Sequence, residues 1–189
     1  MANYPLDMPL KCPILGFVAR SGTGKTQLIE SLLPIFQRYA LRVGVIKHSH
    51  HNYTIDIPGK DSDRLRTAGA AEVALVSAHR WTWIKENPVP LEPRLDEVLL
   101  LFAHSALDMI LVEGFHGTPF PKIEIFRQDY NKTPLFLEDS CIIAVACDNL
   151  LPLSPPVHLV VLPLNQPESI FEFIHSRMIV PQDQTHGAS

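Results

Sequence analysis

The chain has 189 residues, with 16 lysines and arginines against 20 aspartates and glutamates, and a formal net charge of −4. With 46% hydrophobic and 19% charged residues, it is neither a disordered chain nor a coiled coil. The acidic balance gives no overall attraction to nucleic acid or to an anionic membrane surface, and no apolar run is long enough to span a bilayer. Residues 1–10 lack an apolar signal core, so we expect a cytoplasmic protein without nucleic-acid or membrane partners.

Short apolar runs alternate with segments of helical period along the chain, which is typical of α/β proteins. The segment from Lys25 to about Tyr39 is a predicted helix, because its apolar residues recur every three or four positions. Shorter helices are predicted at 61–71, 95–102 and 168–179. Strands are predicted at 13–17, 42–47, 72–77, 108–113, 141–147 and 158–162. This order predicts a mostly parallel sheet flanked by helices.

Two further segments, residues 80–85 and 122–127, alternate apolar and polar side chains. This period favours half-exposed antiparallel strands over buried parallel ones. Trp81 and Trp83 fall on the same face of the first segment. We expect them to pack a half-buried sheet face or to contact a second subunit.

The strongest chemical signal is the run ARSGTGKT from Ala19 to Thr26, between a predicted strand and a predicted helix. It matches the P-loop pattern GxxxxGK[ST] except that the first glycine is alanine, which is harmless if φ is negative there and strained if φ is positive. Backbone N–H groups and the helix N-terminus would hold phosphates, Lys25 would reach the β- and γ-phosphates, and the Thr26 hydroxyl would bind Mg²⁺. The predicted phosphate contacts are Ser21, Gly22, Thr23, Gly24, Lys25 and Thr26. We therefore expect residues 12–179 to form a single P-loop nucleotide-binding domain between tails at 1–11 and 180–189.

Three carboxylates are candidates to complete a metal site. Glu113 ends a predicted strand, and ligands of open α/β sheets lie at the carboxyl ends of strands. There it could hold a metal-bound water or orient an attacking water, so we interpret it, with Lys25, as catalytic. Asp56 and Asp61 lie in a polar stretch after the second predicted strand. Either could bind the metal, although Asp61 could equally be an N-cap of the helix that follows.

Two other polar sites follow predicted strands. Asp148 could accept hydrogen bonds from guanine, although an Asx turn explains it equally well because no NKxD string is present. The run KHSHH at 47–51 has no zinc-motif partner. We expect Lys47 or a neighbouring histidine to contact phosphate or a partner at the mouth of the nucleotide site.

Taken together, these strings resemble MobB, the molybdopterin-guanine dinucleotide biosynthesis adaptor family. The resemblance rests on SGTGKT at 21–26, IKHSHH at 46–51, DIPGKDSDRLRTAGA at 56–70 and LVEGF at 111–115, and covers roughly residues 12 to 175. The third string is the most specific, because a bare P-loop occurs in many NTPases.

The resemblance implies a protein that binds GTP with Mg²⁺ and has weak GTPase activity at most. It implies a homodimer to which the antiparallel segments contribute. It also implies an accessory role beside the guanylyltransferase MobA, which joins GMP to molybdopterin. Asp56, Asp61 and Glu113 fall within the family strings, and the sequence leaves open which of them touches the metal and whether the chain itself binds molybdopterin.

Two alternatives stay open at this point. An ATP-dependent small-molecule kinase would share this type of loop, with residues 48–62 as a lid, but would also need an acceptor site and a base. A binding module without useful catalysis would use nucleotide only to order a dimer or a partner surface.

Overall fold

The computed structural model describes residues 12–20, 22–49, 56–129, 133–148, 151 and 154–180. The chain divides into two compact units, one made of Met1–His48 and Leu95–Ser189 and the other of Ser49–Arg94. The prediction of a single domain over 12–179 stays a prediction. Among the described residues, no helix combines the length and apolar character that a membrane crossing needs.

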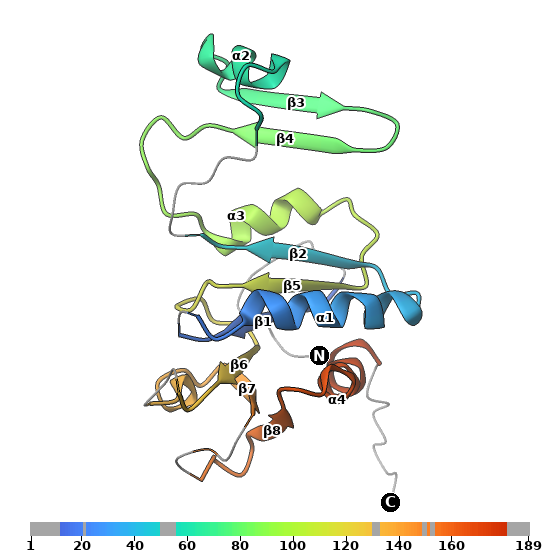
Figure 1. The fold of residues 1–189 in the computed structure, drawn as a ribbon, viewed down its shortest axis with the longest axis vertical. Helices are drawn as coiled ribbons and strands as arrows, with labels where there is room; N and C mark the ends of the chain where they lie inside the picture. The colour runs from blue at the N-terminus through green and yellow to red at the C-terminus, as the bar shows by residue number, and fades with distance from the viewer. Residues whose placement is uncertain are drawn as a thin grey trace, which may run out of the picture. The chain divides into compact units, whose positions relative to one another are not determined.

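The first unit is built on a parallel sheet of six described strands, in the order β2-β5-β1-β6-β7-β8 (Figure 1). Every neighbouring pair in this sheet runs parallel. The strands are β1 (Ile14–Val18), β2 (Val43–Lys47), β5 (Met109–Glu113), β6 (Lys122–Phe126), β7 (Ile142–Cys147) and β8 (Val160–Pro163). The predicted mostly parallel sheet is confirmed.

Helices cover both faces of this sheet because alternate side chains of the central strands point in opposite directions. Helices α1 (Lys25–Arg38) and α4 (Pro167–Ile174) pack on the face that carries Leu15 and Leu111. Helix α3 (Leu95–Leu99) packs on the face that carries Ile110 and Val112. Short helical turns η1 (Leu100–Phe102), η2 (Leu135–Leu137) and η3 (His175–Ile179) complete the unit. The apolar stripe predicted for α1 is the stripe that it buries.

Strand β6 contradicts the prediction of a half-exposed antiparallel strand at residues 122–127. It runs parallel between β1 and β7, and all five of its residues are buried. Its polar side chains are tolerated because each has a partner. The ammonium of Lys122 donates to Asp139 Oδ2 at 2.8 Å, and the Glu124 carboxylate accepts the N–H groups of η2 residues Leu135 and Phe136 at 2.7 and 2.9 Å. Burial raises the pKa of Glu124, and these two hydrogen bonds oppose the rise.

The second unit contains α2 (Asp61–Thr67) and a two-stranded antiparallel sheet of β3 (Glu72–Val76) and β4 (Trp81–Lys85). The antiparallel prediction for residues 80–85 is confirmed, and the strand at 72–77 is its partner rather than part of the parallel sheet. Trp81 and Trp83 share a face with Val76, since residues paired directly across a ladder point to the same side. Trp81 is 81% exposed and Trp83 46% exposed, which leaves this face open for a partner.

Replacing Lys122 tests the account of β6. We expect Lys122→Met to lower the free energy of unfolding by about 3 kcal/mol, because it leaves the Asp139 carboxylate without its buried counter-ion. Lys85→Met is the matched control, since it removes the same side chain from an exposed position of the other alternating strand. It should change stability by less than about 0.5 kcal/mol in the same urea titration. Equal effects of the two substitutions would contradict the assignment of Lys122 to the interior.

Candidate nucleotide-binding site

The predicted phosphate loop connects β1 to α1. Gly22 and Gly24 have φ of 80° and 93°, in the left-handed region that favours glycine. Gly24 is the N-cap of α1, no side chain caps the helix, and no acidic residue lies in its first turn. The first N–H groups of the helix are therefore available to an anion, as the sequence predicts. Ser21 lies outside the described residues.

The alanine at the first loop position causes no strain. The described non-glycine residues with positive φ are Ala40 and Phe115, so Ala19 has ordinary backbone geometry. Ala19 is 3% exposed and packs within the apolar cluster beneath α1. The departure from the glycine pattern is thus harmless to the loop.

Lys25 begins α1 with its side chain turned back over the loop. Its Nζ lies 3.4 Å from the carbonyl oxygen of Ala19. Burial lowers the pKa of Lys25, Glu113 opposes this change, and Lys47 adds to it. A phosphate here would favour the charged ammonium and offset the cost of burial.

Helix α1 and strands β5 and β2 bring a hydroxyl, a carboxylate and a second ammonium together. Thr26 Oγ1 donates to the Glu113 carboxylate, with Oε1 at 3.1 Å and Oε2 at 2.9 Å. Lys47 Nζ donates to Thr26 Oγ1 at 2.9 Å and lies 3.5 Å from Glu113 Oε2. The sheet register pairs Glu113 with both Phe17 and Lys47. Glu113 and Lys47 therefore lie side by side near the carboxyl ends of their strands, next to the end of β1 from which the loop begins. Hydroxyl and carboxylate oxygens are hard ligands that suit Mg²⁺ when phosphate oxygens complete its shell.

The backbone after Glu113 fixes this geometry. Gly114 has a φ of 104°, and a Cβ on it would lie 2.8 Å from the Cβ of His48. The N–H of His48 donates to the Glu113 carbonyl at 2.8 Å, and its ring stacks on Phe115 at 4.5 Å between centroids. The glycine in the string LVEGF therefore lets the ends of β2 and β5 approach.

A second polar cluster joins the phosphate loop to the end of β7. Arg127 Nη1 donates to Asp148 Oδ2 at 2.7 Å, and Arg127 Nε donates to the carbonyl of Thr23 at 3.1 Å. Asp148 Oδ1 is buried and accepts no hydrogen bond from the described residues. A buried acceptor without a hydrogen bond lowers the stability of the folded protein unless a ligand supplies a donor.

Sequence reasoning misses Arg127. It follows β6, and the interpretation of that segment as an antiparallel surface strand placed it away from the loop. Once β6 is parallel and adjacent to β7, Arg127 and Asp148 both lie at the carboxyl edge of the sheet, where ligands bind. A basic residue directly after a central strand is the signal that could have identified it.

Asp56 and Asp61 belong to the second unit, where both have partners. Asp56 accepts from Ser62 Oγ at 2.7 Å, from Arg66 Nε at 3.2 Å and from the N–H of Ile57 at 3.0 Å. The hydrogen bond from Ser62 is the largest cause that lowers the pKa of Asp56, and burial opposes it. Asp61 is exposed and begins α2, whose N-cap is Lys60. Their metal-binding roles stay predictions.

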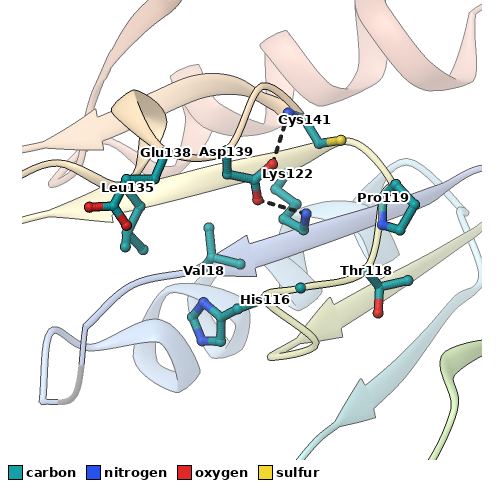
Figure 2. A pocket seen from close by; sticks show the side chains of 10 residues that line it. Val18, His116, Thr118, Pro119, Lys122, Leu135, Glu138, Asp139 and Cys141 are labelled. Atoms are coloured by element: carbon teal, nitrogen blue, oxygen red, sulfur yellow. Dashed lines mark hydrogen bonds and ion pairs between the residues drawn. The ribbon is translucent and has the colours of Figure 1, made fainter.

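The polar groups elsewhere in the described part of the chain do not form a separate metal site. No group of three or more His, Cys, Asp or Glu side chains among the described residues is arranged to hold a metal ion. His50 and His51 lie outside the described residues. A cavity of about 380 Å³ surrounds the Lys122–Asp139 pair (Figure 2). None of the residues predicted for the nucleotide site lines it, so it is distinct from that site.

A parallel sheet with a GKT loop at the start of α1 and a carboxylate bonded to the loop threonine defines a P-loop nucleotide-binding protein. The family model described as MobB, molybdopterin guanine dinucleotide synthesis protein B, matches residues 14–148. The chain belongs to the MobB family. The resemblance seen in the four sequence strings is confirmed.

Relatives support the assignment over most of the chain. A molybdopterin-guanine dinucleotide biosynthesis adapter protein of Escherichia coli is 42% identical over 163 residues, which is 86% of this chain and 91% of the relative. The adapter protein of the same description from Haemophilus influenzae is 40% identical over 164 residues, 87% of this chain and 88% of the relative. The crystal structure of Bacillus subtilis MobB superposes with a TM-score of 0.67 at 22% identity, over 88% of this chain and 98% of that one. The last comparison supports the fold.

The two glycines near Glu113 give a test of the site's geometry. Gly114→Ala should lower the free energy of unfolding by about 1–3 kcal/mol, because it forces an alanine to positive φ against His48. Gly117→Ala is the control, since a Cβ there meets nothing within 4 Å. It should leave thermal and urea stability within about 0.5 kcal/mol of the wild type. A Gly114→Ala protein as stable as this control would show that β2 and β5 do not meet at Gly114.

Proposed function

We propose that this chain is a GTP-binding adaptor with slow Mg²⁺-dependent GTPase activity, which assists the guanylyltransferase MobA in attaching GMP to molybdopterin. The contact of Thr26 with Glu113 beside the loop is the observation that supports nucleotide binding. The role in attaching GMP to molybdopterin is supported by the two relatives, which are described as molybdopterin-guanine dinucleotide biosynthesis adapter proteins.

Each group of the site has a role in binding and hydrolysis. The loop N–H groups and Lys25 would hold the β- and γ-phosphates. Thr26 and Glu113 would hold Mg²⁺, which would supply positive charge to the transferred phosphoryl group. Water attacks the γ-phosphorus as the bond to the bridging oxygen breaks, which gives GDP and phosphate. Glu113 would orient this water.

Hydrolysis is expected to be slow in the isolated chain. Arg20 is the one arginine inside the loop, and its Nε donates to the carbonyl of Thr133 at 3.4 Å. An arginine supplied at the γ-phosphate accelerates such reactions by about 10³–10⁵-fold. A partner or a second subunit would have to supply one.

Guanine selectivity is assigned to Asp148. Its buried Oδ1 is an acceptor without a described partner, and guanine presents N1–H and N2–H₂ donors on one edge. Adenine has no donor at the corresponding N1. Filling the vacant acceptor with a guanine donor removes the cost of the buried, unpaired oxygen.

The dimer and the cellular location complete the proposal. The exposed face of β3 and β4 with Trp81 and Trp83 fits a contact between two copies of the chain, because large aromatic side chains are enriched in such contacts. The location that goes with this assignment is the cytoplasm, as expected from the sequence, and the assignment does not require the chain to bind molybdopterin directly. Membership of the MobB family favours the adaptor over the small-molecule kinase.

Nucleotide titrations test the guanine assignment. The wild type should bind GTP at least tenfold more tightly than ATP in the presence of Mg²⁺, a difference of about 1.4 kcal/mol. In Asp148→Asn, Arg127 should hold the amide oxygen and leave the amide NH₂ facing the base. GTP affinity should then fall at least tenfold, while XTP, whose C2 carbonyl accepts from that NH₂, should bind more tightly than GTP. Equal binding of GTP and ATP by the wild type would contradict the guanine assignment.

The adaptor role has its own test. Added wild-type chain should raise the rate at which MobA transfers GMP to molybdopterin, and Lys25→Ala should remove most of this increase because it lacks the phosphate-binding ammonium. Circular dichroism and dimer content of the variant serve as controls. Full stimulation by a Lys25→Ala protein that binds no GTP would favour the binding module in which nucleotide is dispensable.

A further inference from the structure

Lys47 is a second lysine at the phosphate site, and it comes from a different part of the chain than Lys25. It ends β2, a strand at the edge of the described sheet, directly beside Glu113 on β5. Its ammonium lies 2.9 Å from Thr26 Oγ1 and 3.5 Å from Glu113 Oε2. These are the two oxygen-bearing side chains that the proposed function assigns to Mg²⁺.

The ammonium of Lys47 therefore lies where the proposed function places the metal ion. The Thr26 hydroxyl donates a hydrogen bond to Glu113 and accepts a hydrogen bond from Lys47. Glu113 is 8% exposed, and a carboxylate buried to this degree needs a nearby positive charge. Lys47 supplies that charge from the protein itself.

Lys47 and a divalent cation cannot both keep these contacts. Two cations that share Thr26 Oγ1 would lie within a few ångströms of each other, where their repulsion is strong in a partly buried site. The Lys47 side chain is 55% exposed and the Glu113 side chain 11% exposed, so Lys47 is the group that can move. Its flexible four-carbon stem can carry the ammonium to another anion nearby.

The terminal phosphate is the anion that arrives with the metal. In P-loop proteins the metal bridges the β- and γ-phosphates while the loop lysine contacts the same phosphates. Burial lowers the pKa of Lys25, the lysine of the phosphate loop, and Lys47 lies close enough to that ammonium to add to this change. A movement of the flexible Lys47 side chain away from Thr26 would therefore bring it to the phosphate that Lys25 also contacts.

We propose that Lys47 is an exchanging cation: it occupies the metal position in the nucleotide-free protein and moves to the terminal phosphate when Mg²⁺ and a nucleoside triphosphate bind. This inference rests on the proposed nucleotide function. It makes the chain itself the source of one positive charge at the γ-phosphate. It also gives the protein a means to distinguish a triphosphate from a diphosphate.

The test uses the full chain and two binding measurements on Lys47→Met, Lys47→Arg and Arg38→Met. Mn²⁺ is titrated into nucleotide-free protein and followed by electron paramagnetic resonance. GTP and GDP are titrated separately at saturating Mg²⁺. Arg38→Met is the matched control, because it removes one positive charge from the exposed last turn of α1, at the opposite end of the helix from Thr26.

Lys47→Met should bind Mn²⁺ at least tenfold more tightly than the wild type, since no ammonium competes for Thr26 and Glu113. It should bind GTP at least tenfold more weakly and GDP less than threefold more weakly. Lys47→Arg should retain most of the GTP preference, and Arg38→Met should match the wild type in both measurements.

Unchanged Mn²⁺ affinity in Lys47→Met would overturn the competition with the metal. Equal losses for GTP and GDP would overturn the contact with the terminal phosphate. A wild-type chain that binds neither nucleotide would overturn the proposed function and the phosphate contact together, while the Mn²⁺ titration would still decide the competition. Preserved urea stability of each variant shows that folding does not cause these differences.

Discussion

The hydrogen bonds between the Thr26 hydroxyl and the Glu113 carboxylate are the interaction on which the rest of the site depends. They join the first turn of α1 to the end of β5, and so connect the phosphate loop to the sheet beneath it. The contact forms only because β5 lies between β1 and β2, with Gly114 allowing β2 to approach. A shift of β5 by one residue would turn Glu113 to the opposite face and leave Thr26 without a carboxylate.

The other half of the sheet carries Asp148, to which the proposed function assigns the base. Strand β6 carries charged residues through the interior, where Asp139 holds Lys122 and the N–H groups of η2 hold Glu124. This burial sets the position of Arg127, which bonds both to the loop carbonyl of Thr23 and to Asp148. Arg127 thus links the phosphate loop to Asp148, so a change at Asp148 reaches the loop through one side chain.

The sequence predicts local parts of this account well and distant ones poorly. The loop, α1 and the position of Glu113 follow from adjacent residues, because a GKT string at a helix start and an acid at a strand end have a definite local geometry. The strand at β6 is predicted, but its buried, parallel position is missed because its alternating pattern indicates a surface. The partners that allow Lys122 and Glu124 to be buried are 11 to 17 residues away along the chain. Arg127 is missed together with this position. The sequence alone does not predict that Ala19 is unstrained or that Lys47 contacts Thr26. These conclusions depend on backbone angles and interatomic distances.

A crystal structure of the chain with Mg²⁺ and a non-hydrolysable GTP analogue tests the central claim most directly. The account predicts the β- and γ-phosphates on the N–H groups of the loop, the metal on Thr26 Oγ1 beside Glu113, and a guanine N–H within hydrogen-bond distance of Asp148 Oδ1. A nucleotide bound away from the loop, or a metal held without Thr26, would contradict it.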